Sequence, residues 1–199
     1  MYSAYQALIF DMDGTVIDSL PAHQKAWEYI LERYHIPYTP QVMNYLNGWP
    51  SLQTVEYLCE RSGLQELDIQ KISDEKEQFY REIAPTMVKP TPIVDIVKTY
   101  FGQKPLALGT GAMTHEATSL LKHLGIRDYF QVIVGADQVV AHKPAPDTFL
   151  RCAAMLGIEP KDCLVFEDAE AGLEAAKKAN MSSIDVRTIW QGQYFVVDA

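Results

Sequence analysis

The sequence has 199 residues, of which 48% are hydrophobic and 22% charged, as is typical of a globular protein that needs no disulfides to fold. The formal net charge is −9 and lysines and arginines do not cluster, which argues against nucleic acids and membranes as partners. No run approaches the ~20 apolar residues of a membrane span, and no signal-peptide pattern opens the chain. Three widely spaced cysteines suit reduced thiols, so we expect a cytoplasmic protein.

The first half of the chain predicts one strand followed by helices. The apolar run 7–10 is typical of a buried parallel strand, and it ends at Asp11. Helical periodicity follows at about 20–34, 40–46, 52–62 and 66–83. Prolines at 85, 90 and 92 then predict a linker that returns to the sheet.

The second half alternates helices and strands. Helices are predicted at about 92–101, 113–124, 146–156 and 169–179, and strands at about 105–110, 132–134, 163–167 and 183–186. This alternation predicts right-handed βαβ units, hence an α/β fold with a Rossmann-like parallel sheet and helices on both faces. We predict a core of residues 1–18 and 89–199, with 19–88 as an inserted small helical domain. The tail from 189 to 199 has no clear assignment.

Polar residues stand at four successive predicted strand ends, where open α/β sheets bind ligands. They are Asp11 and Asp13, then Thr110 and Gly111, then Lys143 in the following loop, and finally Glu167 and Asp168. Alternate residues of an extended chain face the same way, so both first carboxylates can point into one site. Gly111 can expose a backbone N–H to an anion.

This set of side chains suits a phosphoryl group and a magnesium ion. Carboxylates that share one focus repel one another unless a hard cation joins them, and Mg²⁺ prefers oxygen ligands. A lysine and a hydroxyl at the same focus neutralise and hold phosphoryl oxygens. Each feature alone also has a structural interpretation, such as a turn, a helix cap or a solvated charge. Their joint occurrence in this order favours a functional site.

These motifs resemble those of the haloacid dehalogenase superfamily, over essentially the whole chain. The resemblance implies that Asp11 is the nucleophile and that Asp13 is the general acid and base, its backbone carbonyl also binding Mg²⁺. Thr110 would then hydrogen-bond the phosphoryl oxygens, and Lys143 would neutralise charge near Asp11. Glu167 and Asp168 would complete the metal site with Asp11. Dehalogenases of the superfamily lack the second aspartate, so Asp13 points to phosphoryl transfer.

The likeness is greatest to the subgroup of β-phosphoglucomutase and small sugar-phosphate phosphatases, in which a helical cap closes over the core. It implies that His23 and Lys76 bind substrate. His23 is equally compatible with a structural role, and the Lys- and Glu-rich surroundings of Lys76 favour a solvated helix face. Trp27 shares a helical face with His23 and is expected in the core.

One departure from the mutases concerns the second phosphate. Mutases of this subgroup carry an arginine near the position of Ser51, and losing a guanidinium there removes a strong anion contact. We therefore predict a Mg²⁺-dependent phosphatase acting on a small phosphorylated metabolite such as a sugar phosphate. β-Phosphoglucomutase activity remains the alternative. A phospho-acceptor receiver domain is a remote alternative, since it lacks the helical insert. The sequence does not indicate an oligomeric state.

Overall fold

The structure is a computed structural model that describes residues 2–47 and 49–190; the final nine residues of the unassigned tail lie outside this part. The described chain divides into two compact units. One comprises residues 2–18 and 89–190 and holds the sheet, and the other comprises the helices of residues 19–88.

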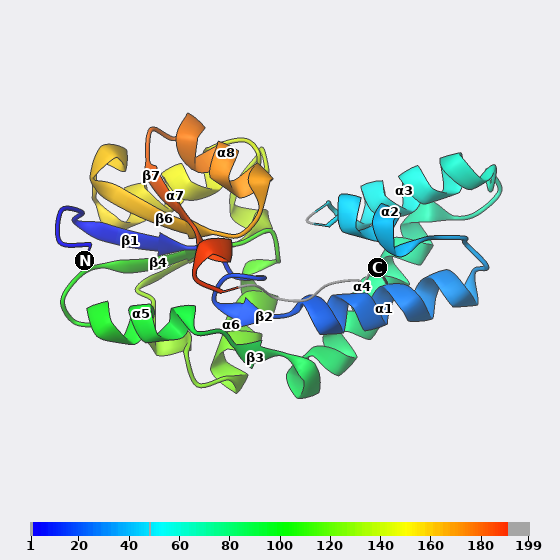
Figure 1. Cartoon of the computed structure of the whole chain (residues 1–199), viewed down its shortest axis with the longest axis horizontal. Helices are drawn as coiled ribbons and strands as arrows, with labels where there is room; N and C mark the ends of the chain where they lie inside the picture. Colours follow the sequence, from blue (N-terminus) through cyan, green and yellow to red (C-terminus); the bar gives the residue numbers. More distant parts are fainter. Residues whose placement is uncertain (1, 48, 191–199) are drawn as a thin grey trace. The chain divides into compact units, whose positions relative to one another are not determined.

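Five parallel strands form the sheet of the first unit (Figure 1). They are β1 (Ala7–Phe10), β4 (Leu106–Gly109), β5 (Val132–Val134), β6 (Cys163–Glu167) and β7 (Ser182–Asp185). Their spatial order is β5-β4-β1-β6-β7, so β1 lies at the centre between β4 and β6. β1, β4, β5 and β6 are buried along their whole length, as expected for parallel strands covered on both faces.

Helices cover both faces of this sheet. Figure 1 shows α7 (Asp147–Leu156) and α8 (Glu170–Lys178) on one side, and α5 (Ile93–Tyr100) and α6 (Thr114–His123) on the other. Phe149 and Cys152 of α7 pack in one apolar cluster with Ile9 and Val165 of the sheet. Four short 3₁₀ segments lie at Arg127–Tyr129, Ala136–Gln138, Pro160–Asp162 and Val186–Thr188. The predicted α/β fold with a parallel sheet is therefore confirmed.

A second, two-stranded sheet was not predicted. β2 (Ile17–Asp18) pairs antiparallel with β3 (Lys89–Pro90), which joins the chain on either side of the helical unit. Two residues per strand are too few to show an alternating pattern, so the sequence carries no signal for this pair.

The helical unit contains α1 (Leu20–Arg33), α2 (Pro40–Tyr45), α3 (Ser51–Ser62) and α4 (Ile69–Met87). It has an apolar cluster of its own, in which Trp27 and Ile30 of α1 pack with Val55, Leu58 and Ile72. Trp27 is buried, as expected. A unit with its own core can hold side chains in fixed positions without support from the sheet.

The end of α4 corrects a prediction. The sequence predicts that the proline at 85 belongs to a linker, but the helix runs through it to Met87. A proline removes one i→i−4 hydrogen bond from a helix. Here the missing bond falls in the last turn, where the Val88 N–H still bonds to the Ala84 carbonyl at 2.9 Å. At the other end, Asp68 caps the helix by accepting a hydrogen bond from the Lys71 N–H at 3.0 Å.

Within the described residues, every helix is too short or too polar to cross a membrane.

Candidate active site

The predicted residues of the sheet unit come from the carboxyl ends of its central strands. Asp11 directly follows β1, Thr110 directly follows β4, and Glu167 is the last residue of β6. Because β1 pairs with both β4 and β6 in parallel, these three positions lie on one edge of the sheet. The sheet thus brings together three residues that stand far apart in the sequence.

Lys143 joins two of these strand ends. Its Nζ lies 2.5 Å from Asp11 Oδ1 and 2.8 Å from Glu167 Oε2, and it donates a third hydrogen bond to the Gly109 carbonyl at 3.2 Å. The ammonium also lies 4.7 Å from the ring centroid of Phe149. The Lys143 side chain is 15% exposed, against 9% for Asp11 and 2% for Glu167, so the three charges are largely withdrawn from solvent. Charges this far from solvent exert a strong electrostatic field on a ligand that binds beside them.

Burial and like charge shift the acidity of these carboxyls. Burial raises the pKa of Asp11 well above its usual value, Glu167 raises it further, and Lys143 only partly offsets the effect. The pKa of Asp168 is raised to about 7, again by burial first and by the charge of Glu167 second. Burial alone would lower the pKa of Lys143, but the neighbouring Asp11 and Glu167 outweigh it and raise that pKa. The site therefore carries more negative charge than one lysine balances.

Asp11, Glu167 and Asp168 can together hold a metal ion. One carboxylate oxygen from each lies within 4.8 Å of the others. Hard oxygen donors held this close, with their charge incompletely balanced, fit Mg²⁺. Thr15 donates a hydrogen bond to Asp168 Oδ1 at 3.2 Å, while Glu167 Oε1 accepts from the backbone N–H groups of Asp168 and Ala169. These contacts fix the orientation of the donor set.

Two glycines allow the close approach of these carboxylates. A Cβ at Gly14, whose φ is +81°, would lie 2.2 Å from Asp168 Oδ2. A Cβ at Gly172 would lie 1.9 Å from Glu167 Oε2. Side chains at either position would occupy the space of the acidic cluster, so the site requires glycine at both, and at Gly14 the positive φ favours glycine as well.

Three further predicted residues lie in the adjoining loops. Asp13 is half-buried in the tight turn after β1, where the N–H of Gly14 bonds to the carbonyl of Ile17 at 2.8 Å.

Thr110 is 1% exposed and its Oγ1 accepts from the Ala112 N–H at 3.1 Å. Gly111 is exposed in the same loop. Thr110 follows Gly109, whose carbonyl accepts from Lys143, so this loop is tied to the ion pairs.

His23 and Lys76, the predicted substrate contacts, belong to the helical unit. They contact each other, with Lys76 Nζ 3.1 Å from His23 Nδ1. Lys76 is only 2% exposed, so the interpretation of its surroundings as a solvated helix face is wrong. Lys76 is enclosed because α4 packs against α1 and α3, which place His23, Trp27 and Ser51 around its ammonium. The local sequence is rich in Lys and Glu and gives no sign of this burial.

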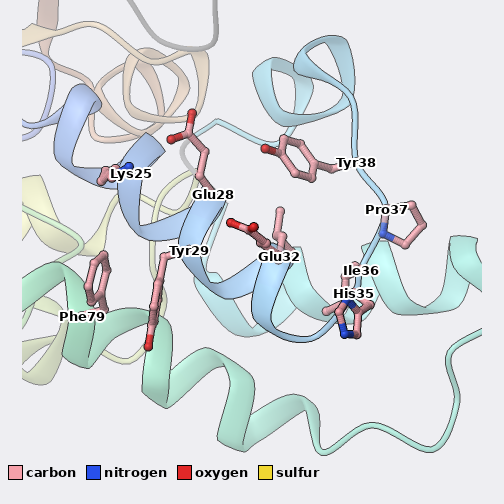
Figure 2. Close-up of a pocket in the computed structure, with 10 residues that line it drawn as sticks. Lys25, Glu28, Tyr29, Glu32, His35, Ile36, Pro37, Tyr38 and Phe79 are labelled. Atoms are coloured by element: carbon pink, nitrogen blue, oxygen red, sulfur yellow. The ribbon is translucent and has the colours of Figure 1, made fainter.

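The helical unit also has a hollow of about 700 Å³ (Figure 2). Lys25, Glu28 and Glu32 of α1 line it, together with Tyr38 of the segment after α1 and Phe79 of α4. Its lining residues include none of those predicted for catalysis, metal binding or substrate binding.

The fold and this site define an α/β enzyme with a buried aspartate, a lysine paired with it and a cluster of three acidic residues at the sheet edge. Residues 8–186 match the haloacid dehalogenase-like hydrolase family. The chain is 45% identical over 189 residues to fructose-1-phosphate phosphatase YqaB of Escherichia coli (strain K12), covering 95% of this chain and all of that one. The chain belongs to the haloacid dehalogenase-like hydrolase family.

Two further similar proteins are a phosphatase and a mutase. A phosphorylated carbohydrates phosphatase of Thermotoga maritima is 32% identical over 90% of this chain and 83% of its own. The crystal structure of a β-phosphoglucomutase from Clostridium difficile superposes with a TM-score of 0.78 at 25% identity, covering 98% of this chain and 91% of that one. With phosphatases of this family among the proteins it is similar to, the present enzyme is a phosphoric monoester hydrolase.

Two residues that contact predicted site residues were missed at the sequence level. Thr15 is part of the first motif, and its hydrogen bond to Asp168 follows from the parallel pairing of β1 with β6. Glu77 contacts Lys76 and Ser51 in the helical unit. It stands in a helix with many charged residues, so no sequence signal distinguishes it.

Proposed function

We propose that the enzyme hydrolyses a small sugar monophosphate, of the kind represented by fructose 1-phosphate, through a covalent phosphoryl intermediate on Asp11 in the presence of Mg²⁺. The contact of Asp11 with Lys143 is the observation that carries this proposal. Lys143 holds one carboxylate oxygen of Asp11 at the end of β1 and can neutralise the charge of a phosphate that binds there. We also propose that residues 1–18 with 89–199 are the catalytic core and that residues 19–88 are a cap domain.

The first half-reaction transfers the phosphoryl group to Asp11. A carboxylate oxygen of Asp11 attacks phosphorus, and the bond between phosphorus and the sugar oxygen breaks. Asp13 donates its proton to that leaving oxygen, which departs as the sugar hydroxyl. Thr110 and the N–H of Gly111 hydrogen-bond the phosphoryl oxygens, and Lys143 balances their charge.

The second half-reaction releases phosphate. Asp13, now a carboxylate, takes a proton from a water molecule whose oxygen attacks phosphorus, and the bond to Asp11 breaks. Mg²⁺ would be held by the carboxylates of Asp11, Glu167 and Asp168 and by the backbone carbonyl of Asp13. The ion would supply positive charge against the phosphoryl oxygens.

The test is phosphate release from a panel of phosphorylated metabolites with Mg²⁺ present, using wild type and Asp11→Asn. An amide cannot form an acyl phosphate, so the variant should release no phosphate while its circular dichroism spectrum stays that of the wild type. Asp128→Asn, which makes the same exchange on a 3₁₀ segment outside the site, is the matched control and should retain activity. Substantial turnover by purified Asp11→Asn would contradict the covalent mechanism.

β-Phosphoglucomutase activity is the second candidate, because a solved mutase is among the structural relatives. A mutase must retain a bisphosphate and turn it over, and a neutral hydroxyl at Ser51 is a weaker phosphate contact than a guanidinium. The two activities separate when β-glucose 1-phosphate is supplied with a trace of the 1,6-bisphosphate and both products are followed. We expect free phosphate to exceed glucose 6-phosphate; the reverse result would make the enzyme a mutase.

A further inference from the structure

A lysine with its charge fully engaged lies inside the helical unit. The Nζ atom of Lys76 is 3.1 Å from His23 Nδ1, 3.1 Å from Ser51 Oγ and 3.0 Å from Glu77 Oε1. An ammonium group has three N–H donors, and these three acceptors match them. Trp27 and Tyr80 add their ring faces, with centroids 4.9 Å and 5.5 Å from the nitrogen. A substrate phosphate would have to displace existing partners to reach this cation.

Lys76 determines which tautomer a neutral His23 adopts. Because the Lys76 ammonium can only donate, His23 Nδ1 must accept, and a neutral His23 then carries its proton on Nε2. The imidazole is also stacked on the Tyr80 ring, with centroids 3.9 Å apart and planes 7° apart. His23 is therefore held as a rigid hydrogen-bond donor.

Lys76 also favours the ionised form of Glu77. Burial would raise the pKa of this carboxyl, but Lys76 and the hydrogen bond from Ser51 outweigh it and lower that pKa. The Ser51 hydroxyl accepts from Lys76 and donates to Glu77, so it links the two charges. Glu77 remains ionised at neutral pH, and its side chain is 36% exposed where that of Lys76 is 2% exposed. The carboxylate is thus the charged group of this cluster that a ligand can reach.

We propose that His23, Ser51 and Glu77 form a hydroxyl-recognising face of the helical unit, with Glu77 as the residue that excludes a second phosphate. An imidazole N–H donor and a carboxylate acceptor match sugar hydroxyls, which both accept and donate. The same carboxylate repels a phosphate dianion. Lys76 is then a positioning residue that holds the other three, and not itself a substrate contact. The inference rests on the proposed function and narrows its substrates to monophosphates with free hydroxyls.

The experiment compares fructose 1-phosphate with fructose 1,6-bisphosphate as ligands of three proteins: the parent, Glu77→Gln and Glu82→Gln. Glu82 lies on the same helix, is exposed and hydrogen-bonds Gln78, so its variant makes the same charge change away from the cluster. Affinities are measured by calorimetry in an Asp11→Asn background, and kcat/KM for both sugars is measured with Asp11 intact. Binding in the inactive background is read without turnover, so it tests this inference even if the proposed hydrolysis fails.

We expect the parent to favour the monophosphate, and Glu77→Gln to reduce that preference by about tenfold or more, because a like charge beside the second phosphate is removed. Glu82→Gln should leave the preference unchanged. Glu77→Asp keeps the charge and should keep the preference, which provides a test if Glu77→Gln folds poorly. An unchanged preference in Glu77→Gln, an equal shift in Glu82→Gln, or loss of the preference in Glu77→Asp would each overturn the proposal.

Discussion

Lys143 contacts two carboxylates that would otherwise repel each other, and the candidate site depends on this arrangement. Its ammonium lies 2.5 Å from Asp11 Oδ1 and 2.8 Å from Glu167 Oε2. Glu167 Oε1 is at the same time engaged by two backbone N–H groups. Each of these groups is therefore positioned before any ligand binds, which reduces the reorganisation that a reaction requires.

At the residue scale, Asp13→Asn should slow hydrolysis by about 10²–10⁴-fold for sugar phosphates, the usual contribution of general acid–base catalysis. A sugar alkoxide is a poor leaving group and needs a proton, whereas p-nitrophenolate leaves without one. The loss should therefore be smaller for p-nitrophenyl phosphate. Steady-state kinetics with both substrates measure the difference. Equal losses would assign Asp13 to metal binding or to structure.

Gly172→Ala should impair catalysis through Glu167. The new Cβ would overlap the Glu167 carboxylate, whose two oxygens are both engaged, so the carboxylate must move away from Lys143. A displacement of about 1 Å in a catalytic constellation can cost ~10²-fold in rate. We expect a loss of that order in kcat, with far-UV circular dichroism unchanged. Near wild-type kcat would mean that the position of Glu167 is unimportant for turnover.

At the scale of the elements, the sequence predicts the sheet site well and the helical cluster poorly. Strand ends of a parallel sheet meet at one edge, so Asp11, Thr110 and Glu167 could be grouped from their positions after apolar runs. The cluster around Lys76 depends on how α1, α3 and α4 rotate against one another. Helical periodicity gives the buried face of each helix but not this rotation, so Ser51 and Glu77 could not be paired beforehand.

The contact between α3 and α4 should make stability depend on pH. The folded pKa of Glu77 is lowered, so its contribution is present above the unfolded pKa of about 4.3 and is lost as pH falls through the folded value. Urea unfolding should therefore show wild type more stable than Glu77→Gln at pH 7, with the gap narrowing below about pH 4. Glu82→Gln should show no such trend. A gap that is constant with pH would contradict the assigned ion pair.

At the scale of the whole molecule, an acidic protein concentrates part of its unbalanced charge in one buried place. The formal charge is −9, and three carboxylates share the sheet edge with a single paired lysine. The sequence predicts this excess from the order of its motifs, since each acidic residue stands at the end of a strand or directly after it. The sequence could not predict that residue 172 must be glycine to leave space for the Glu167 carboxylate, because this depends on the conformation of the Glu167 side chain.

Mg²⁺ should therefore stabilise the folded enzyme as well as support turnover. A ligand that binds only the native state at 100 times its dissociation constant adds about 2.7 kcal/mol. For a chain of this length each kcal/mol raises the unfolding midpoint by roughly 2–4 °C. Millimolar Mg²⁺ should thus raise the midpoint by several degrees in a thermal scan, and EDTA should reverse the rise and abolish phosphate release. Asp168→Asn removes one proposed ligand and should reduce the rise, whereas Asp162→Asn, on a 3₁₀ segment before β6, should not. An equal rise in wild type and Asp168→Asn would place the ion elsewhere, and phosphate release that persists in EDTA would remove the metal from the reaction.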